Sequence, residues 1–120
     1  MITFLVMSST GDPYTIYCDA SGGRVAISCT CQAGELGQMC KHKATVITGD
    51  DSLLYDEGQR AAFNEAHAAC QATSIPTLYE ELSKELKVID KEERVVRTEF
   101  KKRRNSTRGR FARMLSEGVS

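Results

Sequence analysis

Three cysteines and one histidine lie within 14 residues of this 120-residue chain, at Cys29, Cys31, Cys40 and His42. Thiolates and a neutral imidazole are the ligands that Zn²⁺ takes in structural sites, where four of them form a tetrahedral shell. The first residues do not have the pattern of a secretory leader, and the sequence contains no membrane-length apolar run. We therefore expect a cytoplasmic protein with reduced thiols. Clustered thiols in such a chain usually bind metal. We therefore predict one structural zinc ion at these four side chains.

Two predicted elements position these ligands. Cys29 and Cys31 come at the end of a predicted strand, along which side chains two positions apart share a face. Cys40 precedes a predicted helix, and His42 lies in its first turn. The positive end of the helix dipole and the neighbouring lysines favour the thiolate form of the cysteines. The geometry is therefore suited to closing a tetrahedral site.

The spacing Cys-x-Cys, eight residues, Cys-x-His resembles that of the SWIM-type zinc finger, over roughly residues 14–49. A strand precedes the first pair, and the apolar residues Ala44, Val46 and Ile47 follow the last. The resemblance implies that the two pairs occupy the four ligand positions of the family. It also implies a module that binds DNA or protein.

The cluster has two other interpretations. The cysteines could be small buried hydrophobic residues beside a surface histidine, but their clustering argues against this. A hydrolytic zinc would need an open coordination position and a general base, for which Glu35 is the only carboxylate in the loop. Four protein ligands leave no such position, so we expect that the chain is not an enzyme.

The rest of the sequence predicts an α+β fold. Residues 2–8, 14–18 and 24–28 are rich in β-branched and aromatic residues and are separated by glycine-containing turns, which indicates a three-stranded antiparallel sheet. A short helix is expected over residues 41–48, a second over residues 53–72, and a longer one from Thr77. We expect a zinc-binding module in residues 1–49, a helical region in 50–105 and a basic flexible tail in 106–120.

The longest predicted helix carries an apolar stripe, which Glu93 interrupts and which consists of Leu78, Leu82, Leu86, Ile89, Val96 and Phe100. The favoured interpretation is a helical hairpin in which this stripe packs on the helix of residues 53–72. The alternative is that the stripe binds a partner, and this alternative includes self-association with a second copy of the chain. Cys18 and Cys70 are expected in the core, and His67 is assigned no role.

The charge of the chain is balanced overall but unevenly distributed. Residues 1–86 carry a net charge of −6 and residues 87–120 a net charge of +6. Seven basic residues and no acidic one stand between positions 101 and 113: Lys101, Lys102, Arg103, Arg104, Arg108, Arg110 and Arg113. This segment predicts non-specific binding of DNA or RNA through phosphate contacts, whereas the alternative is a solvated run that complements the helix dipole.

A cluster of four acidic residues favours a different class of partner. Asp50, Asp51, Asp56 and Glu57 follow the predicted zinc-binding module and could dock on a basic protein surface. In that hypothesis the chain is a small adaptor or inhibitor, of phage or mobile-element type, that attaches to a nucleic-acid-handling protein complex. Both hypotheses make the chain a binding module.

Overall fold

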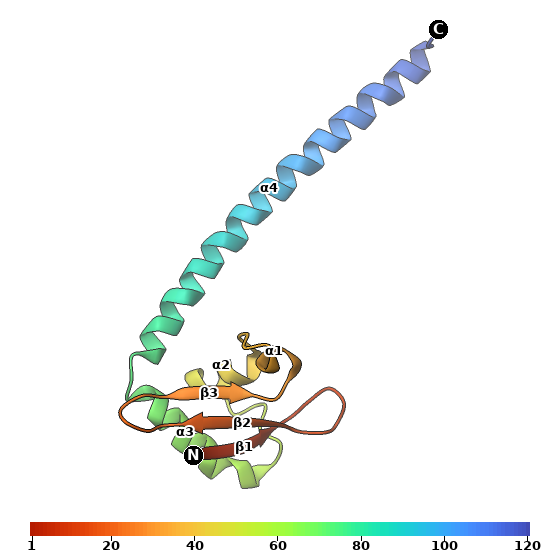
Figure 1. Cartoon of the computed structure of the whole chain (residues 1–120). Coiled ribbons are helices and arrows are strands. Elements are labelled where there is room, and N and C mark those ends of the chain that lie inside the picture. The colour runs from red at the N-terminus through yellow and green to blue at the C-terminus, as the bar shows by residue number, and fades with distance from the viewer. The chain divides into compact units, whose positions relative to one another are not determined.

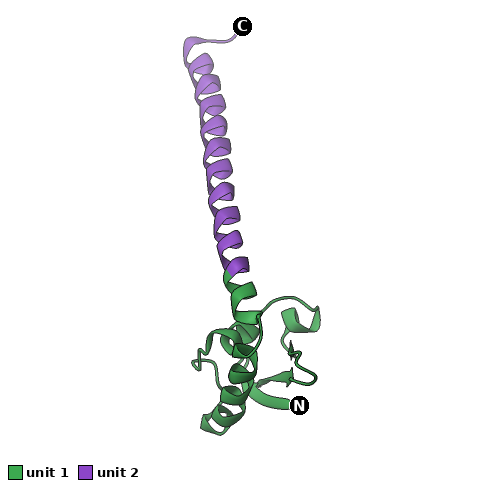
Figure 2. Cartoon of the chain, turned by 90° about the vertical axis from the view of Figure 1, so that its left-hand side faces the viewer, with its two compact units in different colours: residues 1–80 green, residues 81–120 purple.

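The computed structural model describes all 120 residues, which divide into two compact units, Met1–Glu80 and Glu81–Ser120 (Figure 2). The first unit contains the sheet, the short helices and every buried side chain. The second contains most of one long helix (Figure 1). The α+β class predicted from the sequence is confirmed.

The sheet has three antiparallel strands in the order β1-β2-β3, with β1 at Ile2–Val6, β2 at Tyr14–Asp19 and β3 at Ala26–Cys29. Ile16 of β2 lies opposite both Phe4 and Cys29. Because side chains alternate between the two faces of a strand, this register places all three on one face, where they are buried. The last residue of β3 is therefore both a core residue and a candidate metal ligand.

The helices of the first unit pack against this sheet (Figure 1). Phe63 is buried at 5.7 Å from Phe4, measured between ring centroids, in an edge-to-face arrangement that aromatic pairs favour. The elements of this unit are the short helix α1 (Gln32–Glu35), α2 (Lys41–Thr48), the 3₁₀ turn η1 (Glu57–Gln59) and α3 (Arg60–Gln71). The helix α3 contacts β1 and α2, and α2 contacts β3, so the core lies between the sheet and these helices.

The outer edge of β1 is covered by the segment that leads into α3. The Met7 N–H donates to the Leu53 carbonyl at 2.8 Å, and the Tyr55 N–H donates to the Leu5 carbonyl at 3.1 Å. The side-chain oxygen of Gln59 accepts from the Leu5 N–H at 2.8 Å. These bonds give hydrogen-bond partners to backbone groups that an edge strand would otherwise leave unpaired.

The long helix α4 runs over Ile75–Glu117 and has no buried residue. It begins where the Thr73 hydroxyl accepts a hydrogen bond from the Ile75 N–H at 3.1 Å. Pro76 is tolerated in the first turn because the N–H it lacks would have no partner within the helix. Ile75 packs against the core of the first unit. None of the helices combines the length and the apolar character that crossing a bilayer requires.

The structure corrects two expectations. The helix expected over residues 53–72 begins only at Arg60, after an irregular segment and η1. The segment after residue 105, expected to be a flexible tail, is helical as far as Glu117. A glycine within a helix, here Gly109, costs only about 1 kcal/mol, and the Thr107 hydroxyl donates a hydrogen bond to the Arg103 carbonyl within the helix. The side chains of the apolar stripe, from Leu78 to Phe100, are exposed, and the packing of this stripe on the helix of residues 53–72 stays a prediction.

The domain boundaries after residues 49 and 105 stay a prediction. In the structure, α3 and the segment before it pack on the sheet and belong to the first compact unit. The helix α4 includes both the end of that unit and the basic residues.

Candidate metal centre

The four predicted ligands are brought together at the ends of three elements. Cys29 is the last residue of β3, Cys31 is the N-cap of α1, Cys40 is the N-cap of α2, and His42 is the second residue of α2. Their ligand atoms all lie within 4.8 Å of one another. Three of the side chains are buried and Cys40 is half-buried. The sequence prediction that these residues converge is confirmed.

Backbone N–H groups at two helix starts face the thiols. The Gly34 N–H donates to Cys31 Sγ at 3.3 Å, and the Lys43 N–H donates to Cys40 Sγ at 3.4 Å. Such bonds stabilise the negative charge that a metal-bound thiolate carries. The two cysteines therefore act both as helix caps and as ligands.

The orientation of His42 is suited to metal binding through one particular nitrogen. Nδ1 lies 3.7 Å from Cys29 Sγ, toward the thiols, whereas Nε2 lies 3.1 Å from the Met7 carbonyl oxygen. If Nδ1 binds the metal, Nε2 carries the proton and donates it to that carbonyl. A metal-bound histidine almost always donates its second ring N–H in this way. The donor set and the second hydrogen bond thus fit one zinc ion.

The surroundings shift the pKa values of two thiols in opposite directions. Burial raises the pKa of Cys29 to about 12. Burial opposes ionisation of Cys31 as well, but hydrogen bonds from the Gly34 N–H and from neighbouring thiols outweigh it and lower the pKa of Cys31. Cys31 is therefore the thiol more readily deprotonated, and a metal ion has to displace the proton of Cys29.

The imidazole of His42 is held in its neutral form. Burial lowers its pKa, and the nearby charge of Lys41 adds to this effect, although the hydrogen bond to Met7 opposes it. A neutral imidazole is the form that binds a metal ion. Near neutral pH the histidine is thus ready to act as a ligand without losing a proton.

One glycine determines how closely the loop of the site can approach the sheet. A Cβ atom added to Gly34 would lie 2.1 Å from the carbonyl oxygen of Cys29. Only glycine allows α1 to lie this close to the end of β3. Sequence reasoning missed Gly34, as it did the Met7 carbonyl, because neither has a signature in a single sequence.

The remaining cysteines and the second histidine lie outside the cluster. Cys18 and Cys70 are buried in the core, as expected, and burial raises the pKa of both. His67 has a structural role that the sequence did not indicate, because its Nδ1 lies 2.8 Å from the Val46 carbonyl and thus links α3 to α2.

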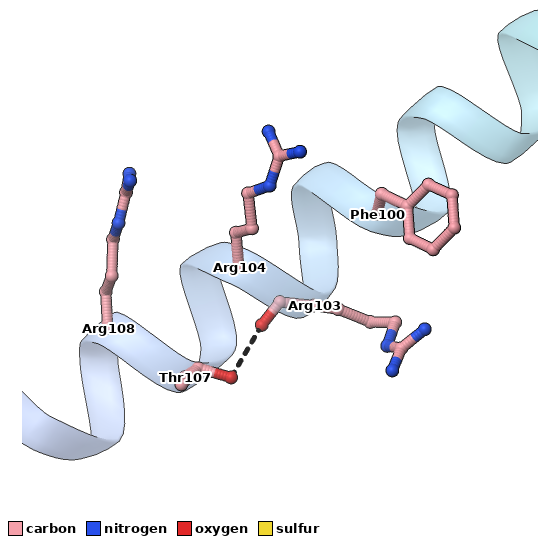
Figure 3. Close-up of a pocket in the computed structure, with 5 residues that line it drawn as sticks. All are labelled: Phe100, Arg103, Arg104, Thr107 and Arg108. Carbon is pink, nitrogen blue, oxygen red and sulfur yellow. Dashed lines mark hydrogen bonds between the residues drawn. The ribbon is translucent and has the colours of Figure 1, made fainter.

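The basic residues of the sequence prediction lie on α4 and are exposed. Arg104 and Arg108 extend from the same side of the helix, and with Phe100, Arg103 and Thr107 they line a surface groove (Figure 3). The Arg103 guanidinium lies 5.7 Å from the centroid of the Phe100 ring, within the range of a cation–π contact.

The acidic residues of the alternative hypothesis are engaged locally. Arg60 forms ion pairs with both Asp51 and Glu57. The side chains of Asp50 and Asp56 each accept a hydrogen bond from a residue two or three positions further along the chain. Arg60 thus offsets part of the negative charge of this group.

Comparison with known proteins agrees with the geometry of the cysteine and histidine cluster. Residues 14–48 match the family model of the SWIM zinc finger. No curated protein and no solved structure matches the chain. The ligand order, the strands before the first pair and the helix after the last are those implied by the resemblance. We conclude that residues 14–48 form a SWIM-type zinc finger, a binding module with one structural Zn²⁺, and that Cys29, Cys31, Cys40 and His42 are the four clustered side chains that could hold it.

Proposed function

We propose that this chain is a non-catalytic binding module that contacts DNA or RNA through residues 101–113 of α4. The observation that carries the proposal is a run of seven exposed cations on one continuous helix, with no carboxylate among them. None of the seven forms an ion pair in the structure. Unpaired Lys and Arg side chains along one helix are suited to neutralising phosphates, which dominate non-specific affinity for nucleic acids.

The arrangement of these cations supports phosphate contact more than a purely local role. Lys101, Arg104 and Arg108 follow one another at spacings of three and four residues, so they share one side of the helix. A run that only complemented the helix dipole would lie in the last turn, and the last turn of α4 contains no basic residue. The pattern therefore favours an external anion. An arginine side chain can also contact a phosphate through two N–H groups at once.

The absence of catalysis is proposed from the chemistry of the metal centre. Three thiolates and one imidazole fill the tetrahedral shell that zinc takes in structural sites. A hydrolytic zinc keeps one position for water. The zinc finger therefore supplies a rigid fold, and we assign the contact with the ligand to α4.

The experiment measures how binding of a short DNA duplex and of a single-stranded RNA depends on salt. If five to seven of the cations contact duplex phosphates, log K should fall with log salt with a slope of about −4 to −6. Replacing Lys101, Arg104 and Arg108 by Gln should reduce the magnitude of this slope by about 3. The matched control replaces Lys87, Lys91 and Arg94 by Gln, which removes the same charge from the same helix. Its slope should change little, because acidic residues surround these positions.

Two outcomes would contradict the proposal. One is a lack of binding to either nucleic acid at about 50 mM salt. The other is an equal loss of binding in both variants, which would mean that only net charge matters. A protein that co-purifies with the chain after nuclease treatment, and is lost when Asp50, Asp51, Asp56 and Glu57 are replaced by Ser, would instead favour the adaptor hypothesis.

A further inference from the structure

The second unit carries a row of exposed apolar side chains that the zinc finger and the basic segment leave unexplained. Leu82, Leu86, Ile89, Val96 and Phe100 are each between 41% and 50% exposed. With Glu93 they follow one another at alternating spacings of four and three residues. This is the heptad pattern in which two helices pack side by side, with these residues at the a and d positions. We call these six positions the seam.

We propose that α4 pairs through the seam with α4 of a second copy of this chain, as a parallel two-stranded coiled coil. Three observations support this pairing: the exposure of the seam, the charges beside it, and the single polar residue within it. The inference does not depend on nucleic-acid binding. The seam lies in residues 82–100, whereas the proposed phosphate contacts lie in residues 101–113; of these, only Arg104 also lies beside the pair.

The seam is an exposed apolar surface. Five large apolar side chains recur on one face of a helix in which no residue is buried. Removing apolar area from water is favourable, so a face of this kind favours association with another apolar surface. A second copy of the same helix supplies a seam of the same length and spacing, which is what knobs-into-holes packing requires.

The charges beside the seam favour parallel pairing. The g positions, which precede a, are all glutamate: Glu85, Glu92 and Glu99. In a parallel pair each g residue faces the partner's e residue five positions later. Glu92 then faces Arg97, and Glu99 faces Arg104, of the second copy. One pair, Glu85 with Asp90, is repulsive.

Antiparallel pairing would bring like charges together. In that arrangement g positions face g positions, so glutamates face glutamates along that edge. Along its edges the parallel arrangement has two attractive contacts, each occurring twice by symmetry, against one repulsive contact. It has two costs: Glu93 faces Glu93 of the second copy, a repulsion that the ion pair of each glutamate with Arg97 reduces, and the two basic segments come to the same end. Their mutual repulsion is screened beyond about 8 Å at 0.15 M salt.

Glu93 favours two strands over four. It occupies an a position, and in the single chain Arg97 forms an ion pair with it. A side chain at the a position of a two-stranded coil keeps partial contact with water, whereas a four-stranded core encloses it and raises the cost of its charge. A polar residue at one a position also specifies register and number of strands at some cost in stability.

The first test is sedimentation equilibrium of the full zinc-loaded chain without nucleic acid, up to about 0.2 mM. We expect twice the chain mass of 13.2 kDa. Ile89→Asp should weaken dimerisation more than about 100-fold, because it places a charge in the seam. The matched control is Val88→Asp, which adds the same charge to the adjacent and slightly more exposed residue, outside the seam. It should weaken dimerisation less than about threefold.

A monomer mass at every concentration would overturn the proposal, as would equal effects of the two aspartate substitutions. A mass four times that of the chain would overturn the two-stranded arrangement. These readouts remain valid if the nucleic-acid proposal fails, because every cation of residues 101–113 is retained in both variants.

The second test addresses orientation by exchanging charges across the pair. Glu92→Arg and Arg97→Glu should each weaken dimerisation by about three- to tenfold. The double variant should regain most of the loss, because the attractive contact is restored with reversed signs. Arg97→Glu also breaks the ion pair with Glu93, so recovery in the double variant is the diagnostic result. A double variant that is no stronger than the weaker single variant would exclude parallel pairing.

Discussion

The two units of this chain are stabilised in different ways. In Met1–Glu80 the sheet, α2 and α3 enclose a core, and four side chains from distant positions meet at one metal site. In Glu81–Ser120 no side chain is buried, and the helix depends on backbone hydrogen bonds and local pairs such as that between Arg97 and Glu93. The comparison indicates that the first unit unfolds cooperatively, whereas the second, in a single unpaired chain, gains or loses helix gradually.

Removing zinc should have the largest effect on stability. It should unfold the first unit and leave the helix of the second unit intact. A structural zinc contributes about 10–16 kcal/mol in apparent terms, which is comparable to the total stability of a typical domain, about 5–15 kcal/mol. After chelation we expect the amide protons of β1, β2 and β3 to lose their protection from hydrogen exchange. The circular dichroism of the helix in residues 81–117 should persist.

The control for this experiment is the return of stoichiometric Zn²⁺, which should restore protection in the sheet. Protected strands in a sample that elemental analysis shows to be free of zinc would contradict the view that the metal stabilises this unit.

A pair of phenylalanine substitutions should show how differently the stability of the two units depends on an aromatic side chain. Phe63 is 2% exposed and Phe111 is 60% exposed, although both lie on helices. We expect Phe63→Ala to reduce the free energy of unfolding of the first unit by about 3–5 kcal/mol, because it leaves a cavity beside Phe4. Phe111→Ala should change the helix by less than about 0.5 kcal/mol. Thermal unfolding monitored for each unit measures both, and similar effects would mean that Phe111 is covered in solution.

A pair of glycine substitutions should give the smallest effects, with opposite signs. Gly34→Ala places a methyl group against the Cys29 carbonyl, so we expect a loss of about 1–3 kcal/mol in the first unit and weaker zinc binding. Gly109→Ala meets no atom within 4 Å and should add about 0.5–1 kcal/mol of helix stability in the second. Competition with a chelator measures the first effect and circular dichroism the second. A stabilising Gly34→Ala would show that α1 can move away from the sheet.

Much of the first unit was predictable because its signals are local. The β-branched residues separated by glycine turns indicated the strands, and the helix over residues 41–48 was predicted with its observed bounds because Gly49 ends it in the left-handed conformation. The four ligands were predictable because cysteine and histidine at this spacing have few other uses. The contacts around them, from Met7 and Gly34, were not, since they depend on how distant segments meet.

The second unit shows the limit of periodicity as a signal. The stripe from Leu82 to Phe100 correctly indicated a helix with an apolar face. It contained no information about what covers that face, whose side chains are exposed. The sequence likewise did not indicate the ion pair between Arg97 and Glu93, which lies next to the basic segment.

The hydrogen bond between His42 and Met7 has a consequence for how the metal is exchanged. His42 Nε2 lies 3.1 Å from the Met7 carbonyl, and the Met7 N–H donates to Leu53. One ligand is thereby tied to the residue that follows the first strand, and through it to the segment that leads into α3. When the N-terminal strand separates from the rest of the unit, the imidazole loses its hydrogen bond to the Met7 carbonyl. Ion release and local opening of the N-terminus should therefore occur as a single event with a common rate.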